Sequence, residues 1–213
     1  MKKIIFIVII PSLLISCITT KSPTEENSQT YEKKDLRFDL IYFNQFYWDQ
    51  PADEIIADLG QPILKKELND NIYGYFFKGT KNVKYPNVVS AGFHRSNDGL
   101  RSITITILSN HNENPENYLK EYYSLSSFLE SQYNKPVKSE ILAKNSDVQI
   151  TGLDLLNQKI AFYEIWKLGN AIMMHAMFYE VNHMNHILSF IDPSSQDIDA
   201  AVREFERNLD RIF

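Results

Sequence analysis

The sequence predicts an α+β fold, in which an antiparallel sheet packs against helices on one face. Strand-like segments follow one another across short links rich in Asn, Asp and Gly, a pattern typical of antiparallel meanders. Segments with helical spacing of apolar residues stand before, between and after these strands. The composition, 44% hydrophobic and 13% aromatic, is that of a chain that buries a core.

The chain begins with a segment typical of a secretory signal peptide. Lys2 and Lys3 precede an apolar run from Ile4 to Ser16. This run is too short to cross a hydrocarbon core of about 30 Å as a helix, which takes about 20 residues. We therefore assign residues 1–16 to a signal peptide and leave them out of the fold.

Cys17 is the only cysteine of the chain and follows Leu14, Ile15 and Ser16. This run resembles the lipobox of bacterial lipoproteins. The resemblance implies cleavage between Ser16 and Cys17, lipid such as palmitate at Cys17, and a lipoprotein with a membrane anchor in the cell envelope. Because Ile18 and not Asp follows Cys17, it also implies the outer membrane if the envelope is Gram-negative. A plain secretory signal with Cys17 there by coincidence, or an uncleaved anchor, remains an alternative.

Residues 17–34 are expected to form the lipidated N-terminus and a flexible tether. They are polar and charged, so they bury too little apolar surface to offset the entropy of ordering. A tether of this length spans roughly 20–25 Å. The folded domain is then expected at residues 35–213.

The first predicted helix covers residues 51–59. Pro51 suits its first turn, Gly60 can cap its C-terminal end, and Pro62 prevents its continuation. The aromatic cluster Phe46, Tyr47 and Trp48 comes just before this helix. We considered it a possible contact surface for a partner, against the alternative that its rings belong to the core.

Four strands are predicted after this helix. Turn-forming residues separate them in pairs, with Asp98 and Gly99 as the strongest hairpin signal. In the fourth strand, isoleucines alternate with polar residues, which predicts one face on the core and one facing water. The predicted strands are 63–68, 72–78, 88–95 and 100–108.

A second helix is predicted from an N-cap at Asn114 to a point before Pro136. A last helix is predicted from Ser194 to the C-terminus, with apolar residues spaced four, three, four and three apart from Ile198. Between the two helices, the predicted strands are 137–142, 158–167, 171–180 and 184–191.

The order of elements indicates two tandem units, each a helix followed by a meander, at residues 35–112 and 113–213. Leu59-Gly60-Gln61-Pro62 before the first meander is echoed by Tyr133-Asn134-Lys135-Pro136 before the second. The alternative is a single α+β domain whose two helices end in similar ways.

The first unit carries a motif that resembles a known lipoprotein family. Trp48, an acidic short helix, and the Leu-Gly-x-Pro run at Leu59, Gly60 and Pro62 are similar to the SmpA/OmlA (BamE) lipoproteins. The wider set with that fold includes the two-repeat architecture of the β-lactamase inhibitory proteins. The resemblance implies a non-enzymatic, lipid-anchored protein that binds other proteins or supports envelope assembly.

No residue pattern indicates catalysis, a cofactor or a metal. His183 and His186 are three apart in a predicted strand, where they point to opposite faces, and His175 is their only neighbour in sequence. The sequence has no nucleophile elbow, phosphate loop or zinc-protease motif. The net charge of −5 and the lack of a basic stripe argue against a nucleic-acid partner.

Three functions therefore stay open, and the first is favoured. The protein is expected to be a lipid-anchored interaction or envelope-assembly module with an unidentified protein partner. The alternatives are a carrier or sensor of an apolar small ligand, held between sheet and helices in the periplasm or at the cell surface, and an enzyme of unrecognised type.

Overall fold

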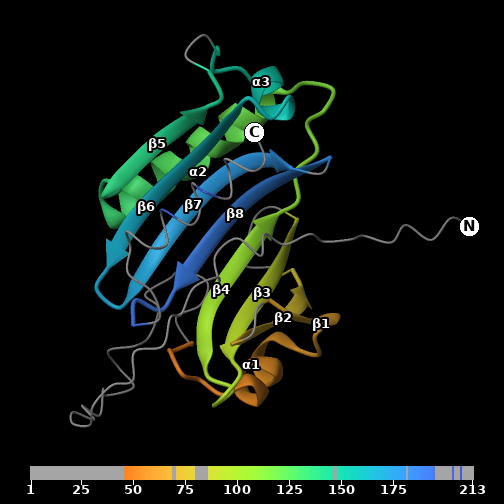
Figure 1. The fold of residues 1–213 in the computed structure, drawn as a ribbon, viewed down its shortest axis with the longest axis vertical. Helices are drawn as coiled ribbons and strands as arrows, with labels where there is room; N and C mark the ends of the chain where they lie inside the picture. The colour runs from red at the N-terminus through yellow and green to blue at the C-terminus, as the bar shows by residue number, and fades with distance from the viewer. Residues whose placement is uncertain are drawn as a thin grey trace, which may run out of the picture.

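The structure is a computed structural model that describes residues 46–68, 71–79, 86–145, 148–180 and 182–194, together with 203 and 207. It contains one sheet of eight strands, all joined by antiparallel pairings, and a few helices (Figure 1). The elements in chain order are α1 (Ala52–Leu59), β1 (Leu64–Glu67), β2 (Ile72–Lys78), β3 (Asn87–His94), β4 (Leu100–Ile107), α2 (Glu116–Tyr133), β5 (Lys138–Ala143), α3 (Gly152–Leu156), β6 (Ile160–Leu168), β7 (Ala171–Glu180) and β8 (His183–Ile191).

The strand order across the sheet is β1-β2-β3-β4-β8-β7-β6-β5. The first four strands run inward from one edge, and the last four run inward from the other. They meet where β4 pairs with β8, with Ile105 opposite Leu188. A single sheet therefore spans both of the predicted units.

The largest core cluster draws on both halves of the sheet and on both longer helices. It includes Ile55 from α1 and Leu129 from α2, next to Trp166 from β6 and Phe190 from β8. A second cluster on β6, β7 and β8 lies on the alternate strand positions, so it faces the other side of the sheet. Its buried members are Ala161, Tyr163, Ile165, Ile172, Met174, Ala176, Phe178, Ile187 and Ile191.

Every predicted strand has a counterpart in the structure, with ends that differ by at most two residues. The prediction that the polar face of β4 meets water is wrong in part. Thr106 is 7% exposed, and the Thr104 hydroxyl lies 2.9 Å from that of Ser189 on β8. Thr106 lies opposite Ile187 of β8, which belongs to the second core cluster, so this end of the polar face adjoins buried apolar side chains.

The helices differ more from the predictions. α1 begins one residue later than the predicted 51–59, with Pro51 just before it, and Pro115, not Asn114, occupies the position before α2. α3 was not predicted, although the Thr151 hydroxyl caps it by accepting from the Asp154 N–H at 3.1 Å. Most of the predicted C-terminal helix lies outside the described residues; Arg203 and Arg207 within it are helical and exposed.

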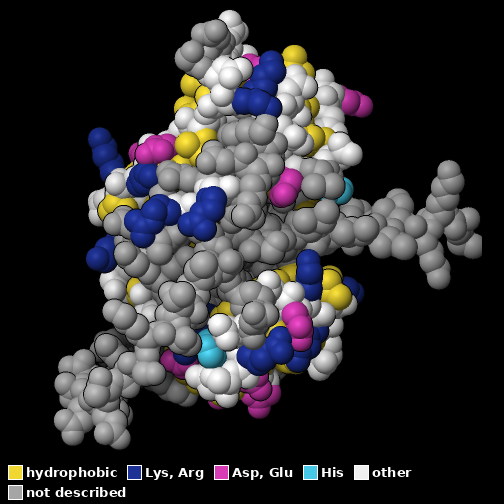
Figure 2. All heavy atoms as spheres, in the orientation of Figure 1, with side chains coloured by type: hydrophobic (Ala, Val, Ile, Leu, Met, Phe, Trp, Pro, Cys, Tyr) yellow, Lys and Arg dark blue, Asp and Glu magenta, His cyan; other side chains and the backbone are white. Residues whose placement is uncertain are grey.

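The face shown in Figure 2 carries a mixed surface. Lys and Arg side chains are interspersed there with acidic and hydrophobic ones. Large apolar side chains are exposed on and beside β5, among them Val137 at 64% and Ile141 at 41%.

Candidate functional site

Four titratable side chains form one line between α2 and the sheet. Glu164 on β6 lies 3.0 Å from Nδ1 of His175 on β7, and Nε2 of His175 lies 2.9 Å from Nε2 of His186 on β8. Nδ1 of His186 then lies 2.7 Å from Oε1 of Glu121 on α2. We call Glu164, His175, His186 and Glu121 the buried chain.

Strand register places three members of the buried chain on one face of the sheet. Glu164 is directly opposite His175, and His186 is opposite Met177, two residues further along β7. Because alternate residues share a face, Glu164, His175 and His186 all point the same way. Glu121 reaches the line from α2, so the buried chain joins the helix to three strands.

Neighbouring side chains complete the hydrogen bonding of the buried chain. Ser126 Oγ donates to Glu164 at 2.6 Å, and Ser109 Oγ donates to Glu121. His111 Nε2 lies 3.1 Å from the second oxygen of Glu121. The ring of Tyr122 stacks on His175, with ring centroids 4.3 Å apart. Each carboxylate oxygen and each ring nitrogen of the buried chain thus has a polar partner.

Burial decides the charge of the two imidazoles. Both side chains are 0% exposed. Burial lowers the pKa of His175 to about 4, although the carboxylate of Glu164 acts in the opposite direction. Burial also lowers the pKa of His186, against the effect of Glu121. Neutral imidazoles are therefore favoured at neutral pH.

In the two carboxyl groups, hydrogen bonds affect the pKa more than burial does. Burial alone would raise the pKa of Glu121, but hydrogen bonds from His186, Ser109 and His111 outweigh it and lower the pKa to about 2. In the same way, burial acts to raise the pKa of Glu164, and its bonds from His175 and Ser126 bring the pKa below its ordinary value. Both glutamates are anions at neutral pH.

The buried chain is suited to holding and exchanging protons. The neighbouring Ser109 and Ser126 donate to carboxylates, so they are not arranged as nucleophiles activated by histidine. Over the ranges that the structure describes, no three His, Cys, Asp or Glu side chains are grouped so that they could hold a metal ion. The geometry points to a link between protonation and the packing of α2.

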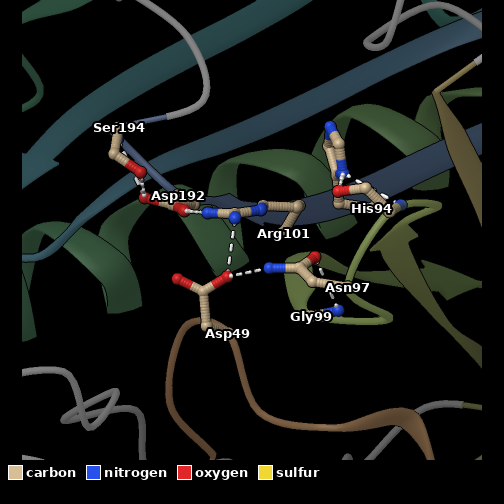
Figure 3. A network of polar contacts seen from close by, with 8 residues as sticks. Asp49, His94, Asn97, Gly99, Arg101, Asp192 and Ser194 are labelled. Carbon is tan, nitrogen blue, oxygen red and sulfur yellow. Dashed lines mark hydrogen bonds and ion pairs between the residues drawn. The ribbon is translucent and has the colours of Figure 1, made fainter. Parts of the chain in front are cut away.

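A second polar network joins three segments at the β4–β8 seam (Figure 3). Arg101 on β4 lies 2.5 Å from Oδ2 of Asp192, just after β8, and 2.6 Å from Oδ1 of Asp49, ahead of α1. Asn97 donates to Asp49 at 3.2 Å, and the Ser194 N–H donates to Asp192 at 2.8 Å. Only 4% of the Asp192 side chain is exposed, so its ion pair with Arg101 is a buried, structural contact.

One edge of the sheet exposes apolar side chains. Among the described strands β5 pairs only with β6. Just past this strand, the Lys144 N–H donates to the Lys159 carbonyl at 2.9 Å. Because paired groups alternate along an antiparallel ladder, the N–H groups of Ser139 and Ile141 point to the open edge. Ile141, opposite Phe162, projects its side chain to the α2 side, and both Ile141 and Val137, just before β5, are exposed.

Tyr123 on α2 extends this apolar edge. It is 45% exposed, and its ring lies 6.0 Å from that of Phe162, the residue opposite Ile141. We call Tyr123, Val137 and Ile141 the β5 edge patch. Such exposed apolar groups beside open backbone groups are typical of surfaces that accept a further strand.

The predicted contact cluster before α1 lies largely in the core, and that expectation is corrected. Phe46 and Trp48 are 0% and 3% exposed, and the Trp48 indole N–H donates to the Asn170 carbonyl. Tyr47 is half-buried and its hydroxyl donates to Glu54 at 2.9 Å. Phe46 and Trp48 belong to the same core cluster as Ile55 of α1.

The other residues considered from the sequence lie in different places. Ser16 and Cys17 lie outside the described residues. His183, the first residue of β8, is exposed while His186 is buried, and the two lie on opposite faces of the strand. His186 pairs instead with His175 through their ring nitrogens.

Sequence reasoning missed Glu121 and Glu164, although a signal was present. Glu164 occupies the third of four alternating positions whose other members are Ile160, Phe162 and Trp166. Glu121 lies three residues after Tyr118, on the apolar side of the predicted helix. A charged residue at a core position of its own element marks a buried polar network.

Comparisons of the chain with protein-family models, with curated proteins and with solved structures give no match.

Proposed function

We propose that this protein is a lipid-anchored, non-enzymatic protein of the bacterial cell envelope that binds another protein. The run from Leu14 to Cys17 supports the anchor, which would be in the outer membrane if the envelope is Gram-negative. None of the described helices combines the length and the hydropathy that crossing a bilayer takes.

The domain at 35–213 is, in this proposal, two helix-plus-meander units, 35–112 and 113–213, with their helices on one face of a shared sheet. The strand order supports it, because each set of four strands runs from an outer edge to the β4–β8 seam. The shared cluster that includes Ile55 of α1 and Leu129 of α2 supports it as well.

The observation that carries the binding part of the proposal is the β5 edge patch. The partner would add an extended segment to β5, using the open backbone groups of Ser139 and Ile141. Apolar side chains of that segment would cover Val137, Ile141 and Tyr123, whose exposure is 64%, 41% and 45%. Main-chain pairing would give affinity, and these side chains would give specificity.

The other edge of the sheet is less suited to this role. β1 has only four residues, all exposed, and two of them are Lys65 and Lys66. Short edge strands and lysines discourage the addition of a further strand. The amino group of Lys65 lies over the ring of Tyr73 on the neighbouring β2, 4.3 Å from its centroid.

The anchor is tested by replacing the only cysteine. Cys17→Ala should abolish incorporation of a labelled palmitate analogue and release the protein from membranes, because no other thiol can accept the lipid. Ser22→Ala, in the same tether, is the matched control and should keep the label. A Cys17→Ala protein that stays membrane-bound and uncleaved would contradict the proposal.

The partner is tested by photo-crosslinking in intact cells. A photoreactive residue at Ile141 should yield a discrete adduct with one protein, because this side chain would lie under the added strand. The control places the same residue at Asp58, an exposed position on α1. Adducts at Ile141 that contain only lipid, or that match those at Asp58, would count against a partner at β5.

A further inference from the structure

We infer that the buried chain is an acid-sensitive latch, which holds α2 against β6, β7 and β8 near neutral pH and loosens the helix on acidification. This inference concerns the folded domain alone and does not depend on the anchor or on a partner at β5.

The first argument is steric. The Nε2 atoms of His175 and His186 face each other at 2.9 Å, a distance that leaves room for one hydrogen at most. Each Nδ1 faces a carboxylate and carries a hydrogen when it donates to it. Both imidazoles therefore cannot be charged in this arrangement. At least one stays neutral for as long as the two rings remain in contact.

The second argument concerns the surroundings. The described titratable groups that face the two histidines come from every element packed on them: Glu121 and Tyr122 from α2, Glu164 from β6, and His111, through Glu121, from the segment before α2. Burial raises the pKa of Tyr122, so its hydroxyl stays neutral. The two carboxylates are thus the only described charges that oppose burial.

The sign of the pH effect follows from proton counts. An exposed histidine has a pKa of about 6.5, and the pKa values of both buried histidines lie below that. Between these values the open state binds protons that the closed state excludes, so acid favours opening. For each histidine that stays neutral, moving from pH 7.5 to pH 5.0 raises the open population about 30-fold.

Loosening would act on a specific part of the molecule. Glu121 and Tyr122 are on α2, and Tyr123 of the β5 edge patch is the next residue along the helix. Opening would uncover the apolar side of α2, where Leu129 joins the main core cluster. Acidification would therefore change the surface beside β5.

The test is hydrogen exchange of α2 amides in the full-length protein in detergent, at pH 7.5 and pH 5.0, after correction for the intrinsic exchange rates. The expected result is a rise of at least about 30-fold in the opening of residues 116–133. Protection of α2 that is unchanged at pH 5.0 would overturn the latch.

Two variants distinguish an effect of the buried chain from a general effect of acid on the protein. In His186→Gln the facing nitrogen and one of the two buried histidines are gone, so the rise should be clearly smaller than in the unaltered protein. His183→Gln changes an exposed histidine on the same strand and should keep the full rise. A full rise in His186→Gln would overturn the latch.

A measurement on the unaltered protein covers the case in which His186→Gln does not fold. NMR signals of the His175 and His186 rings should not both show the charged form at pH 5.0 in the closed state. If both rings are charged at pH 5.0 while α2 amides stay protected, the latch is overturned.

Discussion

At the scale of single residues, replacing Glu121 of the buried chain should have a large effect on stability. It accepts from His186, Ser109 and His111, and it is the one member that α2 contributes. Glu121→Ala should lower the free energy of unfolding at pH 7 by about 3 kcal/mol, because the buried donors lose their acceptor. Urea denaturation followed by circular dichroism measures this change.

The same experiment has a pH signature. The pKa of Glu121 falls from 4.5 to about 2 on folding. Its contribution to stability is therefore complete above pH 4.5 and is lost as the pH falls toward 2. The difference between the unaltered protein and Glu121→Ala should shrink over that range. The control is Glu130→Ala, at an exposed site on the same helix, which should lower the free energy of unfolding by less than about 0.5 kcal/mol. An equal loss at both sites would show that the experiment measures helix propensity and not the buried chain.

At the scale of elements, the sequence predicted those helices and strands that local sequence signals determine. The strands and α1 were found because alternation, turn residues and proline mark them within a few positions. α3 was missed because it is only five residues long, although its capping pair Thr151 and Asp154 is visible in the sequence. Its first residue, Gly152, fits against α2 because a Cβ there would lie 2.1 Å from the Pro115 carbonyl oxygen.

The pairing of residues within the buried chain could not be predicted, for a physical reason. Glu121 and His186 are 65 positions apart, and they meet only when α2 docks on β8 in one register. No local pattern encodes that docking, whereas the strand pairing that brings Glu164 beside His175 joins neighbouring elements. The aromatic cluster at Phe46 and Trp48 failed in a similar way, since its burial depends on α1 and on the distant Asn170.

At the scale of the whole molecule, one sheet and one main core cluster connect both halves. Trp48 lies before α1 and Trp166 lies on β6, yet both belong to the same cluster. The β4–β8 pairing and the contacts of Arg101 add a polar link across the seam. The halves should therefore unfold together, even if they derive from a repeat.

Arg101→Ala tests this cooperativity. It removes the guanidinium beside Asp192, whose side chain is 4% exposed, and should lower the free energy of unfolding by about 3 kcal/mol. Urea unfolding followed by fluorescence in Trp48→Phe and in Trp166→Phe reports on each tryptophan separately. Adding Arg101→Ala to either variant should shift both unfolding midpoints by the same amount, because the seam belongs to both halves.

The control is Arg95→Ala, which breaks the exposed ion pair with Glu67 and should lower the free energy of unfolding by less than about 1 kcal/mol. Midpoints that separate in Arg101→Ala would mean that the shared sheet and core do not hold the halves together without Arg101, which would contradict the expected cooperativity.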